Sequence, residues 1–159
     1  MMQMEINVTT DNTELIKNAT REAVIRALEA VGLQAEGYAK RLCPVDTGLL
    51  RNSITHAVGG VEFKAKYHAQ YGSNRNKKTG KRISYRSKNA GSVRRGSVSG
   101  TVGNADEMTA YLVTNVEYAS YVEYGTSKTK AQPYFKPAIE NHIGQYKRIF
   151  EEYLQDIDG

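Results

Sequence analysis

The sequence predicts an α+β fold in which a small antiparallel four-stranded sheet packs against a long N-terminal helix and a C-terminal helix. Near both ends of the chain, apolar residues recur at alternating spacings of four and three, which is the period of an amphipathic helix. From residue 54 to 71 and from 98 to 116, apolar and polar residues instead alternate with the period of two expected for half-buried strands. A chain of 159 residues has the size of one ordinary domain, so we expect a single domain over residues 1–159.

The first predicted helix is long and amphipathic. Asp11, with Glu14 three residues later, resembles a helix-initiating cap, and Pro44 is expected to end the helix because a proline disfavours helical backbone at the residue before it. Gly32 and Gly37 each cost roughly 1 kcal/mol in a helix interior unless a neighbouring element packs close to them. The apolar positions that follow the helical period are Val24, Leu28, Val31, Ala35, Tyr38 and Leu42.

The strands are expected as two consecutive hairpins. In the first, residues 54–58 pair with residues 61–71 through a turn at Gly59 and Gly60. In the second, residues 98–102 pair with residues 108–116. Together they give the four strands of the predicted sheet.

A tyrosine-rich stretch follows the second hairpin. Tyr118, Tyr121 and Tyr124 fall on one side of one or two helical turns, and Gly125 suits the left-handed conformation that ends such a turn. The last helix is expected to begin at Pro137. The simplest interpretation of the stretch is a packed aromatic corner, and a binding surface is the alternative. The apolar positions of the last helix are Ile139, Ile143, Tyr146, Phe150, Tyr153 and Ile157.

A long basic loop is predicted at about residues 72–97, between the two hairpins. Residues 70–105 hold nine Lys or Arg and no acid, whereas the rest of the chain has a small negative balance. Such a loop can meet phosphates, because neutralising them releases counterions and nearby tyrosines can stack on exposed bases. The other interpretation is a solvated loop. The basic residues are Arg75, Lys77, Lys78, Lys81, Arg82, Arg86, Lys88, Arg94 and Arg95.

Recognisable catalytic motifs are absent from the sequence. It has no Walker loop, dinucleotide fingerprint, nucleophile elbow or paired metal-ligand spacing, and His56, His68 and His142 lie on three different predicted elements. The single cysteine, Cys43, excludes an internal disulfide and suits a buried small side chain. We therefore expect no enzyme activity, no cofactor and no catalytic or metal-binding residues. The first residues also lack a signal-peptide pattern, and no run of about 18 apolar residues predicts a membrane span.

Three blocks of the sequence carry a resemblance to a known family. Residues 39–54 contain Pro-Val-Asp-Thr-Gly-Leu-Leu-Arg-Asn-Ser, residues 115–126 contain Tyr-Ala-Ser-Tyr-Val-Glu-Tyr-Gly-Thr, and residues 131–138 contain Gln-Pro-Tyr-Phe-Lys-Pro-Ala. In this order they resemble the gene-product-ten-like tail-completion family of long-tailed, lambda-like bacteriophages. The basic loop is longer than expected for compact members of that family.

The resemblance implies a structural virion protein at the head-tail junction, present in the host cytoplasm during assembly. It implies a homo-oligomeric ring that docks on neighbouring neck, tail-terminator or tail-tube proteins, with genome DNA as a possible neighbour in the lumen. A ring needs two different contact surfaces on each chain, and the tyrosines together with an extended segment at residues 126–132 can supply one. Six-fold symmetry is expected by analogy, with twelve-fold symmetry as the alternative. The predicted interface residues are Asp46, Thr47, Gly48, Tyr118, Tyr121, Tyr124, Gly125, Thr126, Pro133 and Phe135.

Two alternatives stay open from the sequence. The nine basic residues of the loop are assigned to contact with a polyanion or a protein partner, and we favour a neighbouring protein, or DNA only at the mouth of the ring. The second function considered is a free nucleic-acid-binding module that uses this loop. An enzyme would be supported only if the three histidines met carboxylates in one pocket.

Overall fold

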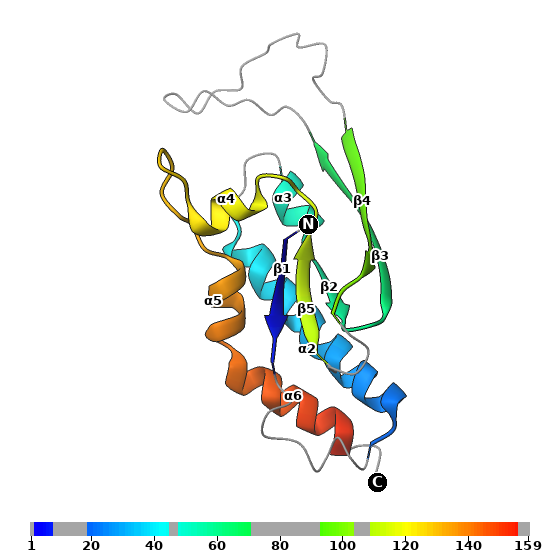
Figure 1. The fold of residues 1–159 in the computed structure, drawn as a ribbon. Coiled ribbons are helices and arrows are strands. Elements are labelled where there is room, and N and C mark those ends of the chain that lie inside the picture. Colours follow the sequence, from blue (N-terminus) through cyan, green and yellow to red (C-terminus); the bar gives the residue numbers. More distant parts are fainter. Residues whose placement is uncertain (1, 8–18, 45–47, 71–92, 104–108, 156–159) are drawn as a thin grey trace.

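The computed structural model describes residues 2–7, 19–44, 48–70, 93–103 and 109–155. Its described part has three layers: helices, a three-stranded sheet and a two-stranded ribbon (Figure 1). The helices are α2 (Arg21–Leu42), α3 (Leu49–Ser53), α4 (Ala119–Tyr124), α5 (Phe135–Glu140) and α6 (Ile143–Gln155). The strands are β1 (Met2–Ile6), β2 (Thr55–Val58), β3 (Glu62–Gln70), β4 (Val93–Thr101) and β5 (Ala110–Thr114).

All strand pairs are antiparallel, and they form two separate sheets. The first has the order β1-β5-β2, in which Met4 and His56 both lie opposite Leu112 of the central strand. The second is a ribbon of β3 and β4, in which Lys64 lies opposite Ser99. The α+β class is therefore confirmed, but the single four-stranded sheet is wrong.

The expected hairpins are also wrong, because the turn at Gly59 and Gly60 sends the chain from one sheet to the other. The amide of Gly59 donates to the carbonyl of Thr109 beside β5, and that of Gly60 donates to the carbonyl of Val102 beside β4. As a result β2 pairs with β5, and β3 pairs with β4. All five residues of β5 are buried, which requires cover on both faces of that strand.

Each face of the three-stranded sheet has its own apolar core. On one face, helices α2, α5 and α6 pack on residues that include Ile6, Val58 and Leu112. On the other face, the ribbon covers Tyr111 and Val113. The central strand thus contributes alternate side chains to two cores, and the ribbon is a third layer rather than part of the sheet.

Helix α2 crosses the sheet and packs closely on it. The hydroxyl of Thr20 caps its first turn by accepting from the amide of Ala23 at 3.3 Å. The helix therefore begins at Arg21, so the predicted start at Asp11 is wrong, and Asp11 itself lies outside the described residues. A Cβ at Gly32 would lie 2.9 Å from the Cβ of His56, so the close neighbour that this glycine requires is present on β2. Nδ1 of His56 is 2.6 Å from Glu36, and the pKa of Glu36 is lowered: burial opposes that shift, but hydrogen bonds from His56 and Lys40 outweigh it.

The lone cysteine is part of the core. Cys43 follows the last residue of α2 as its C-cap, and its thiol is free and buried. Burial raises the pKa of this thiol to about 11, because the thiolate is poorly solvated there. The expected role as a buried small side chain is confirmed.

The last predicted helix is two helices. The first begins at Phe135, two residues before the expected start at Pro137, and the helical hydrogen bonding changes near Asn141 and His142. The hydroxyl of Tyr146 donates to the carbonyl of Ala138 at 2.6 Å, which satisfies an acceptor next to this break. After this break the chain changes direction, and α6 packs against α2 (Figure 1).

The predicted basic loop is partly strand. Strand β4 begins at Val93, so residues 93–97 of the predicted loop belong to the ribbon. Gln70 and Val93 are paired, which means that residues 71–92 connect the two strands of one hairpin. Residues 71–92 themselves lie outside the described residues.

Candidate functional site

Helix α4 carries three exposed tyrosines. Tyr118 precedes its first residue, and the three side chains of Tyr118, Tyr121 and Tyr124 are 42%, 60% and 65% exposed. Ala119 and Glu123 on the opposite side of the same helix are buried. The expected one-sided arrangement of tyrosines is therefore present, and it faces solvent rather than forming a packed aromatic corner.

Glu123 fixes α4 to the following helix. Its side chain is only 2% exposed, and its carboxylate accepts three backbone hydrogen bonds from the start of α5. Oε2 accepts from the amides of Tyr134 at 2.8 Å and Phe135 at 2.9 Å, while Oε1 accepts from that of Lys136 at 2.9 Å. The next residue, Pro137, has no N–H to satisfy. One carboxylate thus satisfies the free amides of this helix start.

Tyr134 packs beneath the surface and contacts the start of α4. It is fully buried, stacks edge-on against Phe135 and donates its hydroxyl hydrogen to the carbonyl of Ala119 at 3.0 Å. Burial raises the pKa of Tyr134 far above its ordinary value, so the hydroxyl remains a donor. Tyr134 and Glu123 together hold α4 in a fixed orientation.

Residues 125–132 form a closed turn instead of the expected extended segment. Gly125 has the positive φ predicted for it, +75°, but its ψ of 174° differs from the left-handed helical conformation expected there. The hydroxyl of Thr126 accepts from the amides of Lys128 and Thr129 at 3.2 and 3.0 Å, and the amide of Thr126 donates to the carbonyl of Thr129 at 2.8 Å. The amide of Gln132 donates a hydrogen bond to the carbonyl of Val122 in α4, which closes the turn. The turn therefore has its own hydrogen bonds and presents an ordered surface next to the tyrosines.

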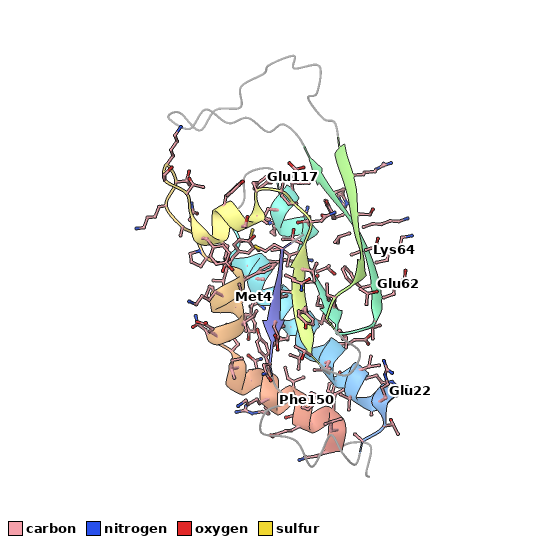
Figure 2. The ribbon with its side chains drawn as sticks, viewed as in Figure 1. Met4, Glu22, Glu62, Lys64, Glu117 and Phe150 are labelled. Atoms are coloured by element: carbon pink, nitrogen blue, oxygen red, sulfur yellow. The ribbon has the colours of Figure 1, made fainter. Side chains whose placement is uncertain are left out.

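Glu117 lies on the segment that leads from β5 into α4 (Figure 2). Two hollows lined by described residues flank this segment. Their volumes are about 440 and 320 Å³. Asn115, Val116 and Glu117 line both of them. The first is completed by Met2, Gln3 and Ser120, and the second by Leu49, Tyr67 and Tyr118. The surface around α4 thus combines protruding tyrosines with adjoining hollows.

Asn115 links this surface to the ribbon. Its side-chain oxygen accepts from the hydroxyl of Tyr67 at 2.8 Å, and its side-chain nitrogen donates to the carbonyl of Ser97 at 2.8 Å. The ring of Tyr67 lies over Gly96, where an added Cβ would approach it to 2.5 Å. The ribbon and the start of α4 are therefore held together by specific contacts.

The other predicted interface residues have different environments. Gly48 is buried at the N-cap of α3, with φ +83°. Pro133 is exposed beside the turn, whereas Phe135 is fully buried, so its side chain is not available to a second subunit in this conformation. Asp46 and Thr47 lie outside the described residues.

Of the nine basic residues, only the last two lie within the described part of the chain. Arg95 is exposed on β4, and the backbone of Arg94 belongs to the same strand. The remaining seven are outside the described residues: Arg75, Lys77, Lys78, Lys81, Arg82, Arg86 and Lys88.

The three histidines lie on separate elements. His56 pairs with Glu36, His142 stacks on Tyr38 with ring centroids 3.6 Å apart, and His68 is exposed on β3. Among the residues that the structure describes, no group of three or more His, Cys, Asp or Glu is placed to hold a metal ion. Within the same part of the chain, no helix combines the length and the apolar character that crossing a membrane requires.

The sequence did not reveal Glu123 and Tyr134 as the residues that orient the tyrosines. Glu123 lies near the end of its own helix, and the amides that donate to it lie eleven to thirteen positions later in the chain. Capping patterns that can be found in a sequence join residues only about three positions apart. One signal was available: Phe135 begins a helix without a Ser, Thr, Asp or Asn before it, so its free amides need a distant acceptor.

Comparison with known proteins gives one family match. Residues 9–125 match the family model described as "Bacteriophage HK97-gp10, putative tail-component". The matched range includes β2 to β5 and the tyrosine helix α4, and it ends at Gly125. Neither the search of curated proteins nor that of solved structures gives a match.

Proposed function

The chain belongs to the HK97-gp10-like family of bacteriophage tail components, and on that premise we propose that it is a structural virion protein which completes the head-tail junction. In this role it assembles as a homo-oligomeric ring and docks on adjoining neck, tail-terminator or tail-tube proteins. It acts by binding its neighbours and carries out no catalysis. The family match supports the tail-component role, and the surface around α4 supports assembly.

The observation that carries the assembly role is the exposure of three tyrosines on one anchored helix. Tyrosine is enriched at protein interfaces because its ring buries a large area while its hydroxyl tolerates water before assembly. The buried contacts of Glu123 and Tyr134 hold the helix in place, so little ordering entropy is lost when a partner binds. The tyrosine surface, defined as Tyr118, Tyr121 and Tyr124, is therefore a preformed docking surface.

A closed ring requires two different surfaces that fit each other on successive subunits. The tyrosine surface, with the hollows that adjoin it, supplies one of them. Six copies are the expected number by analogy with tail proteins, and twelve copies would match a portal.

Replacing Tyr121 and Tyr124 together by Ala should strongly reduce ring assembly and the yield of joined particles. Both side chains are more than half exposed, so the free energy of unfolding should fall by less than about 1 kcal/mol. Circular dichroism melting measures the stability, and complementation of a phage that lacks the gene, followed by electron microscopy, measures the yield.

Tyr153→Ala is the matched control, because Tyr153 is 49% exposed on α6, outside the tyrosine surface. Particles should join normally with this variant. Normal joining with the Tyr121 and Tyr124 double variant as well would remove the support for an α4 interface.

The basic loop is expected to contribute to the joining of phage heads to tails. In a six-fold ring its charges come close together and repel each other unless an acidic protein face or DNA lies opposite. Replacing Lys77, Lys78, Lys81 and Arg82 by Ser should leave the fold intact and lower the titre of infectious particles. A plaque assay measures this, and an unchanged titre would mean that these charges are only solvated.

The alternative function is a free nucleic-acid-binding module. It predicts that the unassembled chain binds short duplex DNA with a dissociation constant of about 1 μM or less at physiological salt. This affinity equals or exceeds that of the tightest typical nonspecific binding. Assembly on phage partners supports the structural role whether or not the free chain binds DNA, whereas such affinity without assembly supports the alternative.

A further inference from the structure

One face of the β3–β4 ribbon is a regular row of polar and basic side chains. Side chains alternate across a strand, so Phe63, Ala65, Tyr67 and Val98 pack on the three-stranded sheet while their neighbours along each strand are exposed. Figure 2 shows Lys64 and Glu62 on the outer side of β3, away from the helices. The exposed positions are Glu62, Lys64, Lys66 and His68 on β3, and Arg95, Ser97, Ser99 and Thr101 on β4.

The two strands place hydroxyls next to cations. Lys64 lies opposite Ser99, Lys66 lies opposite Ser97, and His68 lies opposite Arg95. Successive cations on one strand are about 6.8 Å apart, because each residue of an antiparallel strand rises about 3.4 Å. Among the described residues, no carboxylate forms an ion pair with Lys64 or Lys66. The only acid on this face is Glu62, at the end of the ribbon far from residues 71–92.

The composition of this face distinguishes two classes of partner. Protein interfaces are built around apolar and aromatic anchors, and lysine and serine are depleted there. None of the exposed side chains that the structure describes on the ribbon is apolar, whereas the tyrosine surface has three large aromatic ones. Contacts to the DNA backbone come from Lys and Arg and from side chains with hydroxyl or amide groups, and the exposed ribbon residues include Lys, Arg, Ser and Thr.

We propose that the outer face of the ribbon, formed by Lys64, Lys66, Arg95, Ser97 and Ser99, binds the phosphate backbone of double-stranded DNA without reading its sequence. Lysine and arginine neutralise phosphates, and the serine hydroxyls donate hydrogen bonds between them. Because the tyrosine surface is separate from this face, one chain can contact a protein neighbour and DNA at the same time. This inference adds a ligand to the proposed structural role and does not depend on ring formation.

The test uses the full-length unassembled chain and a fluorescent duplex of about 20 base pairs, with binding followed by anisotropy from about 50 to 200 mM salt, where phosphate contacts are most sensitive. The variant is Lys64→Gln with Lys66→Gln. The matched control is Lys128→Gln with Lys130→Gln, which removes two exposed lysines at the same spacing from the turn beside α4. Circular dichroism verifies that both variants are folded.

The native chain should bind, and the logarithm of its binding constant should fall linearly with the logarithm of salt concentration. At about 50 mM salt, the binding constant of the ribbon variant should be lower by on the order of tenfold for each lysine replaced. The slope of the logarithm of its binding constant against the logarithm of salt concentration should be smaller in magnitude by about 2, since each phosphate contact contributes about 0.9. The control variant should keep the native slope.

Three outcomes would overturn the proposal: no binding by the native chain at low salt, equal loss of slope in both variants, or equally tight and salt-sensitive binding of polyglutamate. The third outcome would assign the ribbon to an acidic protein. The ribbon variant should still join particles at least in part, whereas the Tyr121 and Tyr124 variant should bind DNA normally but fail to join them. Failure of DNA binding is thereby distinguishable from failure of the assembly role.

Discussion

Glu123→Ala should lower the free energy of unfolding by about 3–5 kcal/mol, because it leaves the buried amides at the start of α5 without an acceptor. An unsatisfied buried donor costs about 1–3 kcal/mol, and part of this cost can be relieved when water enters the space left by the side chain. Chemical denaturation measures this loss of unfolding free energy, and an unchanged m-value would show that the variant keeps a native-like fold. Since Glu123 also orients α4, assembly should fail even at temperatures where the variant remains folded.

Two further variants separate the cap from a general charge effect. Glu123→Gln keeps one acceptor oxygen but turns an NH₂ group towards the amide of Lys136 or of Tyr134 and Phe135, so its loss should be intermediate. Glu117→Ala removes an exposed carboxylate just before α4 and should change stability by less than about 0.5 kcal/mol. If Glu123→Ala were as stable as Glu117→Ala, the cap would not be holding α5.

Gly125→Ala should lower the free energy of unfolding by about 2–4 kcal/mol, through backbone strain and a clash that act together. With φ +75° and ψ 174°, Gly125 has a conformation that is open almost only to glycine. An added Cβ would also lie 2.7 Å from the amide nitrogen of Ala131 and 2.9 Å from the carbonyl oxygen of Thr129. Both are backbone atoms of the closed turn, so the turn must shift.

Hydrogen exchange locates the damage in this variant. The amide of Gln132, which donates to Val122, should exchange much faster than in the native chain, while amides in α2 should change little under local opening. Gly144→Ala is the control, because Gly144 lies in helix α6 with no atom near the added Cβ, and alanine there should stabilise the chain by about 0.5–1 kcal/mol. Equal stability of the two variants would mean that the turn adapts without strain.

The amphipathic course of the long helices was predictable because their period is local. Their starts, the break between α5 and α6 and the strand pairing were not. The apolar residues of α2 recur every three or four positions, and Pro44 limits its end. Strand pairing depends on contacts between distant segments, and the turn at Gly59 and Gly60 has the sequence of a hairpin but connects two layers. The run of buried residues in β5 was the available clue, since a strand with one solvent face would alternate.

The surface of the candidate site was predictable in part. The spacing of Tyr118, Tyr121 and Tyr124 predicts one helical face, and the structure exposes all three. Sequence spacing did not reveal that Glu123 reaches the next helix start, because that contact exists only after the turn at residues 125–132 closes. The cations at Lys64 and Lys66 appeared as polar positions of a half-buried strand, and only the pairing of β3 with β4 places them beside Ser99 and Ser97.

An electron cryomicroscopy map of complete phage particles, with this chain located by its side-chain density, tests the central claim most directly. The proposed role predicts a closed ring at the junction between head and tail, with Tyr121 and Tyr124 of each subunit buried against a neighbouring protein. Density for the chain elsewhere in the particle, or a ring at the junction in which these tyrosines face solvent, would contradict it.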